Sequence, residues 1–274
     1  MNCDYQQLKE HATNIRKNII KMTCEAKSGH PGGSLSITDI ITILYFNFMN
    51  INVEGYQDPD RDRFVLSKGH AAPALYAVLA EKGFIEEKEL MTLRKLGSRL
   101  QGHPDMKKLP YVEMSTGSLG QGLSAAVGMA LSAKIDDKDY YTYAIVGDGE
   151  IQEGQIYEAS MFAAHYSLGN LIVFLDNNGL QIDGDIKKVM DPNPLPEKWK
   201  AFNWHVQSID GHNYDEICQA VKNAQEDKER PSMIVAKTIK GKGVSFMENK
   251  ASWHGSAPCD EEKALALAEL EESK

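Results

Sequence analysis

Two short polar segments follow apolar runs in the middle of the chain and could bind a cation. Asp148 stands between Gly147 and Gly149 after the run YAIV, and Asn177 and Asn178 follow the run NLIVFLD. A carboxylate, an amide oxygen and a nearby main-chain carbonyl are hard oxygen donors, which suit Mg²⁺ or Ca²⁺ and do not suit zinc. The two glycines would let a diphosphate approach the backbone N–H groups at the start of the next helix. These residue types are also the usual residues of turns, so each segment has a purely structural explanation as well.

Histidines beside glycine form a second group of candidate residues. Of the eight histidines, four lie in segments that we expect to be loops. Histidine is the commonest acid and base near neutral pH, although a lone loop histidine is usually a surface residue. Four histidines in one sequence context favour a shared function: His30 in SGHPGG, His70 in SKGHAAP, His103 in QGHPD and His254 in WHGSAP. The others match no motif and are expected to be structural: His11, His165, His205 and His212.

Alternating strands and helices must position these residues. Residues 140–146 and 170–176 read as strands, and residues 153–169 between them read as a helix that ends at Gly169. A strand, a helix and a strand in this order form a βαβ unit with parallel neighbouring strands, so Asp148 and Asn178 should meet at one edge of the sheet. The whole chain alternates in this way, which predicts a three-layer α/β fold with a mainly parallel sheet covered by helices on both faces. Ligands of such sheets bind beyond the carboxyl ends of the strands.

The remaining elements follow from apolar periodicity and turn residues. Residues 8–26 show one apolar helix face, and Ser36 with Asp39, in capping-box spacing, predicts the start of the next helix. We expect an exposed helix over residues 86–96 and a proline-rich loop over residues 188–199. Further strands are predicted over 63–67, 204–209 and 231–239, and further helices over 74–83, 123–135, 213–227 and 259–273.

Composition limits the classes of function. A chain of 274 residues with 42% hydrophobic content suffices for the core of one large α/β domain. A net charge of -9, with the lysines dispersed, argues against a nucleic-acid groove. The polar N-terminal segment shows no secretory signal and no stretch approaches the roughly 18 apolar residues of a membrane span, so we expect a cytoplasmic protein. The cysteines form no CxxC pair and are expected to be reduced thiols: Cys3, Cys24, Cys218 and Cys259.

The GDG and NNG segments together resemble the cofactor motif of the thiamine diphosphate enzymes. The motif runs here from residues 147–149 to residues 177–179. The resemblance implies that Asp148, Asn178 and the main chain of Leu180 hold the Mg²⁺ that anchors the diphosphate, with Ca²⁺ as the alternative ion.

Within this class the histidine loops resemble those of transketolase, and the similarity runs over nearly the whole chain. It includes SGHPGG, DRFVLSKGHAAPALYAVLAEKG, STGSLGQGLSAAVGMA and KTIKGKG. The resemblance implies transfer of a two-carbon ketol unit from a ketose phosphate to an aldose phosphate, as in the pentose phosphate pathway. It implies that His30, His103 and His254 bind the sugar and move protons. Contacts with the cofactor are implied for Lys68, His70, Gly117, Leu119, Gly147, Asp148, Gly149, Glu153, Asn178, Lys240 and His254.

Glu153 and Glu158 have two explanations. Carboxylates near a helix N-terminus are favoured by the helix dipole in any protein. The resemblance to transketolase instead implies that glutamates of this segment lie at a subunit contact.

The resemblance also predicts a partner chain. Residues 1–274 are similar to a single domain, the diphosphate-binding domain of transketolase. We expect the pyrimidine-binding and C-terminal domains on a second polypeptide, with two copies of each chain in the assembly. The helix over residues 123–133 and the segment after GDG would lie at the subunit contacts, and the chain alone would be inactive.

Several alternatives remain. The nearest is a split transketolase for an unusual ketose phosphate, branched or sulfonated, because specificity for the distal end of the sugar would sit largely on the partner. The α-subunit of a 2-oxoacid dehydrogenase is disfavoured because its substrate offers no polyol to the histidines, and SKGHAAP with QGHPD fits deoxyxylulose-phosphate synthase less well. A non-catalytic cofactor-binding protein has no need for the complete set of Asp148, Asn178 and loop histidines. A metal-dependent phosphohydrolase lacks a second set of carboxylates.

Overall fold

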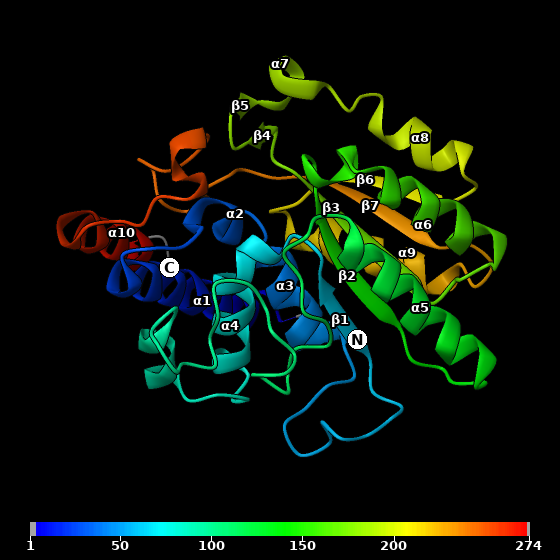
Figure 1. The fold of residues 1–274 in the computed structure, drawn as a ribbon, viewed down its shortest axis with the longest axis horizontal. Coiled ribbons are helices and arrows are strands. Elements are labelled where there is room, and N and C mark those ends of the chain that lie inside the picture. Colours follow the sequence, from blue (N-terminus) through cyan, green and yellow to red (C-terminus); the bar gives the residue numbers. More distant parts are fainter. Residues whose placement is uncertain (1–3, 273–274) are drawn as a thin grey trace.

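A parallel, five-stranded sheet forms the centre of the molecule (Figure 1). The computed structural model describes residues 4–272. The strand order is β1-β2-β3-β7-β6, so the last strand of the chain fills the position between β3 and β6. The strands are β1 (Arg63–Leu66), β2 (Thr142–Gly147), β3 (Leu171–Asn177), β6 (His205–Asp210) and β7 (Ser232–Lys237).

Strands β2 and β3 are parallel neighbours, as predicted, and α6 (Gly154–His165) connects them. Gly147 pairs with Asp176 at their carboxyl ends. The GDG and NNG segments therefore begin at the same edge of the sheet.

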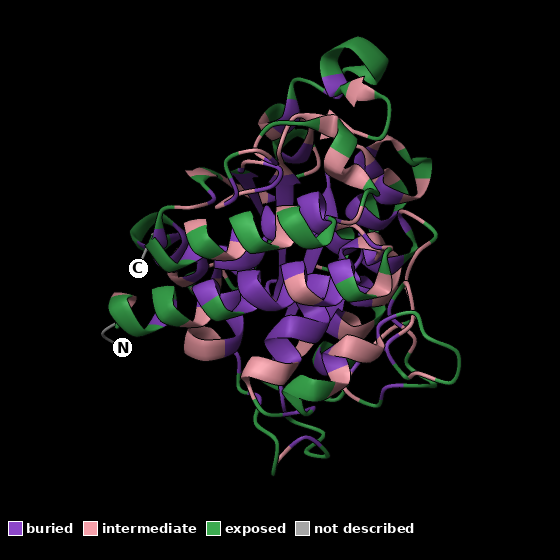
Figure 2. Ribbon diagram, turned by 90° about the vertical axis from the view of Figure 1, so that its left-hand side faces the viewer, coloured by how far each residue is buried: buried purple, intermediate pink, exposed green. Residues whose placement is uncertain are grey.

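The strands are buried on both faces, so their side chains alternate between two hydrophobic cores. Along β2, Tyr143 and Ile145 belong to the first core, whereas Ala144 and Val146 belong to the second. Figure 2 shows this buried interior and the exposed outer surfaces of the helices. Continuous apolar strands are typical of parallel sheets covered on both sides. The predicted three-layer α/β fold is confirmed.

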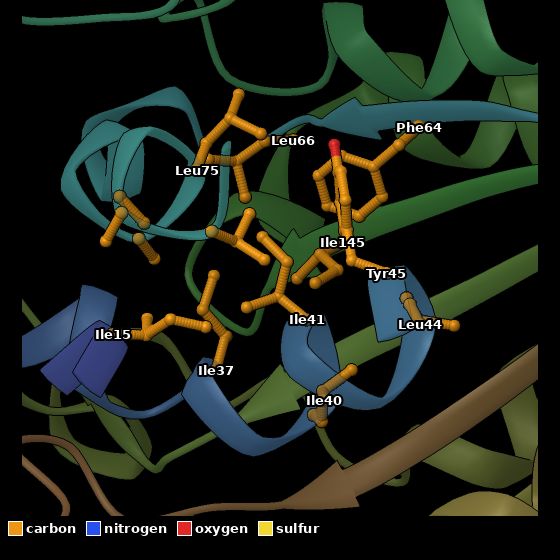
Figure 3. Close-up of a cluster of buried hydrophobic side chains, with 14 of the residues drawn as sticks. Ile15, Ile37, Ile40, Ile41, Leu44, Tyr45, Phe64, Leu66, Leu75 and Ile145 are labelled. Atoms are coloured by element: carbon orange, nitrogen blue, oxygen red, sulfur yellow. The ribbon is translucent and has the colours of Figure 1, made fainter. Parts of the chain in front are cut away.

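Each core is completed by its own set of helices. The second core contains residues of α5 (Gln121–Ile135), α6 and α8 (Leu195–Ala201). In the first core, Ile41, Leu75 and Ile145 meet from a helix, a second helix and a strand (Figure 3). The helices of the first core are α1 (Tyr5–Ala26), α2 (Pro31–Leu35), α3 (Thr38–Ile43), α4 (Ala72–Glu81), α9 (Tyr214–Glu226) and α10 (Asp260–Glu272).

The periodic apolar residues of the N-terminal segment form α1, as predicted. Leu8, Ile15 and Ile19 are buried on one helix face. The Asp4 side chain caps the helix by accepting a backbone hydrogen bond, and Lys27 in the left-handed conformation ends it.

The predicted capping box at Ser36 and Asp39 is wrong. A short helix, α2 (Pro31–Leu35), begins earlier, with proline in its first turn, and α3 continues into a π-helical turn, Leu44–Phe48. The Ser36 hydroxyl donates instead to the carboxylate of Asp176 at 2.7 Å. The side chains of Ser36 and Asp39 therefore bond residues that are distant in sequence and do not cap the helix.

Asp39 forms the centre of a buried polar network. Its carboxylate accepts hydrogen bonds from Arg16 at 2.6 Å and from Tyr214 at 2.8 Å, and it lies 2.8 Å from His212 Nδ1. Burial raises the pKa of Asp39, but the Arg16 charge and the His212 hydrogen bond outweigh it and hold this pKa well below its usual value of 3.8.

Asp39→Asn is expected to destabilise the fold by about 3–5 kcal/mol, because it leaves the Arg16 charge buried without a counter-ion. Since the folded pKa is depressed, Asp39 stabilises the protein above its unfolded pKa of about 3.8, and this contribution is lost as the pH falls below that value. Urea denaturation at several pH values measures both effects. The difference from wild type should shrink below pH 4, whereas the exposed Asp136→Asn control should stay within about 0.5 kcal/mol at neutral pH. Equal stability of both variants at neutral pH would contradict the prediction.

Two segments differ from their predicted structure. Residues 86–96 contain only a 3-10 helix, Glu87–Thr92, and not a helix over the whole segment. Leu90 and Leu93 are buried, whereas the other residues of the segment are exposed or half-buried, as predicted. The proline-rich segment is not a plain loop, because it contains α7 (Ile186–Met190) and most of α8. Proline is tolerated in the first turn of a helix, which is where α8 has it. A short hairpin precedes these helices, formed by β4 (Leu180–Gln181) and β5 (Gly184–Asp185).

Gly169 does not end α6 as predicted, since the helix ends at His165. Gly169 instead allows a close approach of two backbone segments. A Cβ atom there would lie 2.2 Å from the carbonyl oxygen of Lys228.

Within the described part of the chain, Cys24, Cys218 and Cys259 form no disulfide with one another. Cys3 lies outside the described residues. Within residues 4–272, no helix has the length and apolar character needed to cross a membrane.

Candidate active site

A cavity of about 390 Å³ lies beyond the carboxyl ends of the central strands. Glu158 lies outside it, exposed on α6. The structure brings every other predicted site residue to its wall: His30, Lys68, His70, His103, Gly117, Leu119, Gly147, Asp148, Gly149, Glu153, Asn178, Leu180, Lys240 and His254.

The strand ends position the charged groups and oxygen donors of the cavity. Lys68 follows β1, Asp148 follows β2, Asn178 follows β3 and Lys240 follows β7. The histidines come from the connections around the strand ends. His30 lies directly before α2, and His103 lies in the loop before α5. His70 and His254 lie in the 3-10 turns η2 (Gly69–Ala71) and η5 (Ala251–His254).

The predicted metal donors are three oxygen-bearing groups on adjacent strand ends. Asp148 accepts hydrogen bonds from the N–H groups of Gly149 at 2.9 Å and Gly179 at 2.6 Å. Asn178 Oδ1 accepts one from the N–H of Leu180 at 3.1 Å. Within residues 4–272, no group of three or more His, Cys, Asp or Glu side chains is placed to hold a metal. The set of one carboxylate, one amide oxygen and one carbonyl fits a hard cation such as Mg²⁺, which keeps places for phosphate oxygens.

The electrostatics of Asp148 also fit a bound cation. Burial and the neighbouring charge of Asp176 raise the pKa of Asp148 to about 7. A divalent cation between these strand ends would offset both effects.

Asp176 is a fully buried residue that bonds the cavity residue Lys68, and the sequence reasoning missed it. Its fully buried carboxylate lies 2.5 Å from Lys68 Nζ and also accepts hydrogen bonds from Ser36 and Thr238. Burial raises the pKa of Asp176, but the Lys68 charge outweighs it and lowers this pKa overall. Lys68 donates further to the carbonyl of Gly33 at 2.9 Å. A carboxylate inside an apolar, buried strand must be paired or hydrogen-bonded. The position of Asp176 at the end of such a strand was therefore the sequence feature that could have indicated buried partners.

Glu150 is a second buried carboxylate that the sequence reasoning missed. It accepts hydrogen bonds from the N–H groups of Gly120 and Gly147, both at 2.9 Å, and from the Ser67 hydroxyl. Glu150 thereby joins the GDG turn to the loop before α5. The other lining residues that were missed are Gly33, Gln152, Gln181, Ile182 and Asp183.

Lys240 and His254 form a polar pair in the wall of the cavity. Lys240 Nζ lies 2.9 Å from His254 Nδ1 and 3.4 Å from the carbonyl oxygen of Leu180. Burial and the charge of Lys68 lower the pKa of Lys240 to about 8. Two buried lysines in one cavity repel each other and favour a multiply charged anion such as a diphosphate.

The four loop histidines form one cluster around His30. Its ring centroid lies 5.5 Å from His70, 6.2 Å from His103 and 5.5 Å from His254. Burial lowers the pKa of all four rings, to about 4 for His30 and about 3 for His254, so these imidazoles are neutral at pH 7. His30 Nδ1 is buried without a hydrogen-bond partner among the described residues, so it is free to bond a ligand.

Gly117 shows why glycine occupies the loop before α5. Its φ of +144° disfavours side chains, and a Cβ atom would lie 3.1 Å from the ring of His103. The loop can therefore pass close to this histidine.

The remaining histidines make local contacts, as predicted. His11 bonds Glu81 at 2.8 Å, His205 lies 3.3 Å from the Ser232 hydroxyl, and the ring of His165 packs against a neighbouring tyrosine. His212 belongs to the Asp39 network.

Comparison with known proteins agrees with this geometry. The family described as transketolase, thiamine diphosphate binding domain, matches residues 8–270. Over 264 residues the chain is 49% identical to a 6-deoxy-6-sulfo-D-fructose transketolase subunit of Clostridium sp. (strain MSTE9), and the match covers 96% of each chain. It is 42% identical over 257 residues to an apulose-4-phosphate transketolase subunit of Phocaeicola vulgatus, covering 94% of this chain and 91% of that one.

Full-length transketolases match over the same part of this chain but are much longer. Human transketolase is 45% identical over 258 residues, which are 91% of this chain and 40% of the human one. The crystal structure of transketolase from Campylobacter jejuni superimposes with a TM-score of 0.91 at 34% identity, covering 99% of this chain and 43% of that one. The chain thus spans less than half of these enzymes and almost all of the two named subunits. It belongs to the transketolase family and corresponds to its thiamine diphosphate-binding domain.

Proposed function

We propose that this chain is the diphosphate-binding subunit of a two-chain transketolase that transfers a two-carbon ketol unit from a ketose phosphate to an aldose phosphate. The observation that carries the proposal is the cavity itself. It combines an oxygen donor set for Mg²⁺, two buried lysines and four neutral imidazoles at one edge of the sheet. A non-catalytic protein would have no physical need for this combination.

Residues at the ends of different strands would bind different parts of the cofactor and its metal. Asp148, Asn178 and the carbonyl of Leu180 would hold Mg²⁺, with Ca²⁺ as an alternative. Lys68 and Lys240 would supply positive charge to the diphosphate. His70, His254 and the backbone at Gly147 and Gly149 would also contact the diphosphate. Gly117, Leu119 and Glu153 would lie beside the cofactor. Thiamine diphosphate supplies, when bound, the ring carbon that carries the two-carbon unit.

The histidines would bind the sugar and handle protons. A neutral imidazole can donate from one nitrogen and accept at the other, so a row of imidazoles suits a polyol. His30, His103 and His254 approach one another in the cavity. His30 Nδ1, which is buried and unpaired among the described residues, would bond a sugar hydroxyl or carbonyl.

A partner chain with the pyrimidine-binding domain is part of the proposal. Two relatives that match over nearly their full length are named as transketolase subunits. Exposed apolar side chains on α6 and just after it, Met161, Phe162 and Tyr166, offer a surface for subunit contact beside α5. We place two copies of each chain in the assembly, in the cytoplasm, where cysteines would stay reduced.

A sulfonated or branched sugar is the second candidate substrate. The relative at 49% identity is named for 6-deoxy-6-sulfo-D-fructose, and another at 42% is named for apulose 4-phosphate. Both substrates carry a charged end group, like the sugar phosphates of an ordinary transketolase.

Co-expression with the candidate partner tests the function. Two-carbon transfer to ribose 5-phosphate would be measured with thiamine diphosphate and Mg²⁺ for each chain and for the pair, with xylulose 5-phosphate, 6-deoxy-6-sulfo-D-fructose or apulose 4-phosphate as donor. We expect activity in the pair alone, and the donor with the highest kcat/KM identifies the substrate. Cofactor binding without transfer from any ketose would contradict a transketolase, and activity of this chain alone would contradict the split enzyme.

A further inference from the structure

Arg94 lies beside the histidine cluster but belongs to none of the motifs discussed above. It follows the 3-10 helix Glu87–Thr92 in a loop that runs back to His103. After burial, its positive charge is the largest influence that lowers the pKa of both His30 and His103. The guanidinium packs against Gly102, the residue directly before His103, and His103 lines the cavity.

The backbone holds Arg94 in a conformation that is unusual for its residue type. Its φ is +60°, in the left-handed region, which a non-glycine residue adopts only when the surrounding structure imposes it. The Arg94 N–H donates to the carbonyl of Leu100 at 2.9 Å and fixes this turn. Non-glycine residues in such conformations concentrate at functional sites.

The side chain of Arg94 passes over Gly102, the residue before His103. A Cβ atom at Gly102 would lie 2.6 Å from Arg94 Cζ, so only glycine leaves room for the guanidinium in this position. The contact places the charged group against the backbone next to His103.

Most of the hydrogen-bonding capacity of Arg94 is unused. Within residues 4–272 its side chain forms no ion pair, and the one hydrogen bond of the guanidinium goes to the carbonyl of Gly102 at 3.3 Å. A guanidinium has five N–H donors in a fork that matches tetrahedral oxyanions and carboxylates. Arg99 in the same loop differs, because Glu89 binds it through two hydrogen bonds at 2.9 and 2.7 Å. The Arg94 guanidinium is therefore exposed and has donors available for a ligand, whereas the charge of Arg99 is paired with Glu89.

The two ends of the cavity suggest how a sugar would lie. Lys68, Lys240 and the metal donors mark the diphosphate end, and His30 is half-buried beside them. His103 is exposed at the mouth. A sugar whose reacting carbons lie near His30 would extend past His103 toward Arg94.

We propose that Arg94 binds the anionic end group of the sugar substrate, a phosphate or a sulfonate. This inference rests on the proposed function and deepens it, because it gives this chain, and not only its partner, a residue that selects charged substrates.

Steady-state kinetics of the two-chain holoenzyme test the proposal. Arg94→Gln should raise KM for the phosphorylated or sulfonated ketose by about 10- to 100-fold, as expected for loss of charge-assisted hydrogen bonds, with little change in kcat. With the uncharged donor erythrulose and the uncharged acceptor glyceraldehyde, which give glycolaldehyde and a five-carbon ketose, kcat/KM should stay within about 3-fold, the range of an ordinary surface substitution. An equal loss with charged and uncharged substrates, or no loss, would overturn the proposal.

Two further variants separate charge from loop structure. Arg99→Gln removes a paired arginine from the same loop and should leave all parameters near wild type. Gly102→Ala keeps the Arg94 charge but forces the guanidinium to move, and should reproduce the selective rise in KM. If Gly102→Ala behaved like wild type, the position of Arg94 over Gly102 would be irrelevant and the proposed geometry would be wrong.

Calorimetry provides a readout that does not depend on turnover. Glucitol 6-phosphate, which has no carbonyl group to react, should bind the holoenzyme about 10- to 100-fold more weakly in Arg94→Gln than in wild type. Direct comparison of a phosphate and a sulfonate end group identifies which oxyanion the site prefers. A wild-type complex that transfers nothing would contradict the proposed function, and equal binding by wild type and Arg94→Gln would contradict the role of Arg94.

Discussion

Asp148→Ala is expected to abolish Mg²⁺-dependent binding of thiamine diphosphate to the two-chain complex. Asp148 is the one carboxylate in the proposed donor set, so its removal takes away the only anionic ligand that this chain offers the metal. Changes to groups that merely support a metal ligand typically cost 10–100-fold in affinity, so loss of the ligand itself should cost at least about 100-fold. Titration of the cofactor at fixed Mg²⁺, followed by calorimetry, measures the effect.

Asp183→Ala is the matched control for this experiment. Asp183 lines the same cavity, is exposed, and carries the same charge. Its removal should change the affinity by less than about 3-fold, in the range of ordinary surface substitutions. If Asp148→Ala bound the cofactor as tightly as this control, the metal assignment would be wrong.

The two lysines of the cavity are expected to differ sharply in their effect on stability. Lys68→Met should destabilise the cofactor-free protein by about 3–5 kcal/mol, because Asp176 would remain buried without its counter-ion. Lys240→Met should leave it unchanged or more stable, because burial and the Lys68 charge already disfavour the Lys240 ammonium group. Both variants should weaken cofactor binding, since each removes a positive charge facing the diphosphate.

Urea denaturation without cofactor and calorimetry with cofactor separate these effects. The matched pair serves as its own control, because both substitutions are Lys→Met in one cavity. Equal destabilisation by the two variants would show that the ion pair between Lys68 and Asp176 does not contribute more to the stability of the fold than the contacts of Lys240 do. Unchanged cofactor binding in Lys240→Met would remove Lys240 from the diphosphate site.

Local sequence patterns predicted the sheet and the edge at which the site lies. The apolar runs that became β2 and β3 have lengths and flanking glycines that leave little choice of structure. Once those strands are parallel neighbours, Asp148 and Asn178 must lie close together. The histidine loops were found in the same way, because glycine beside histidine marked exposed connections.

The missed features depend on partners that are distant in sequence. Asp176 looked like the end of an apolar strand, and its role became visible only with Ser36, Lys68 and Thr238 around it. The capping box failed for the same reason, because Asp39 bonds a helix and a loop far along the chain. Spacing within one segment carries no information about such contacts.

The position of β7 has a consequence for the order in which the protein is made. The chain forms β3 and then β6, but these strands touch only through β7, which is synthesised last. Lys240 and His254 follow β7, so the cavity gains them only after β7 has left the ribosome. Long-range parallel pairing of this kind slows folding, because distant segments must meet before their contacts stabilise them. A nascent chain that lacks β7 would expose the paired edge of β3 and could not hold the diphosphate, so cofactor capture belongs to the finished polypeptide.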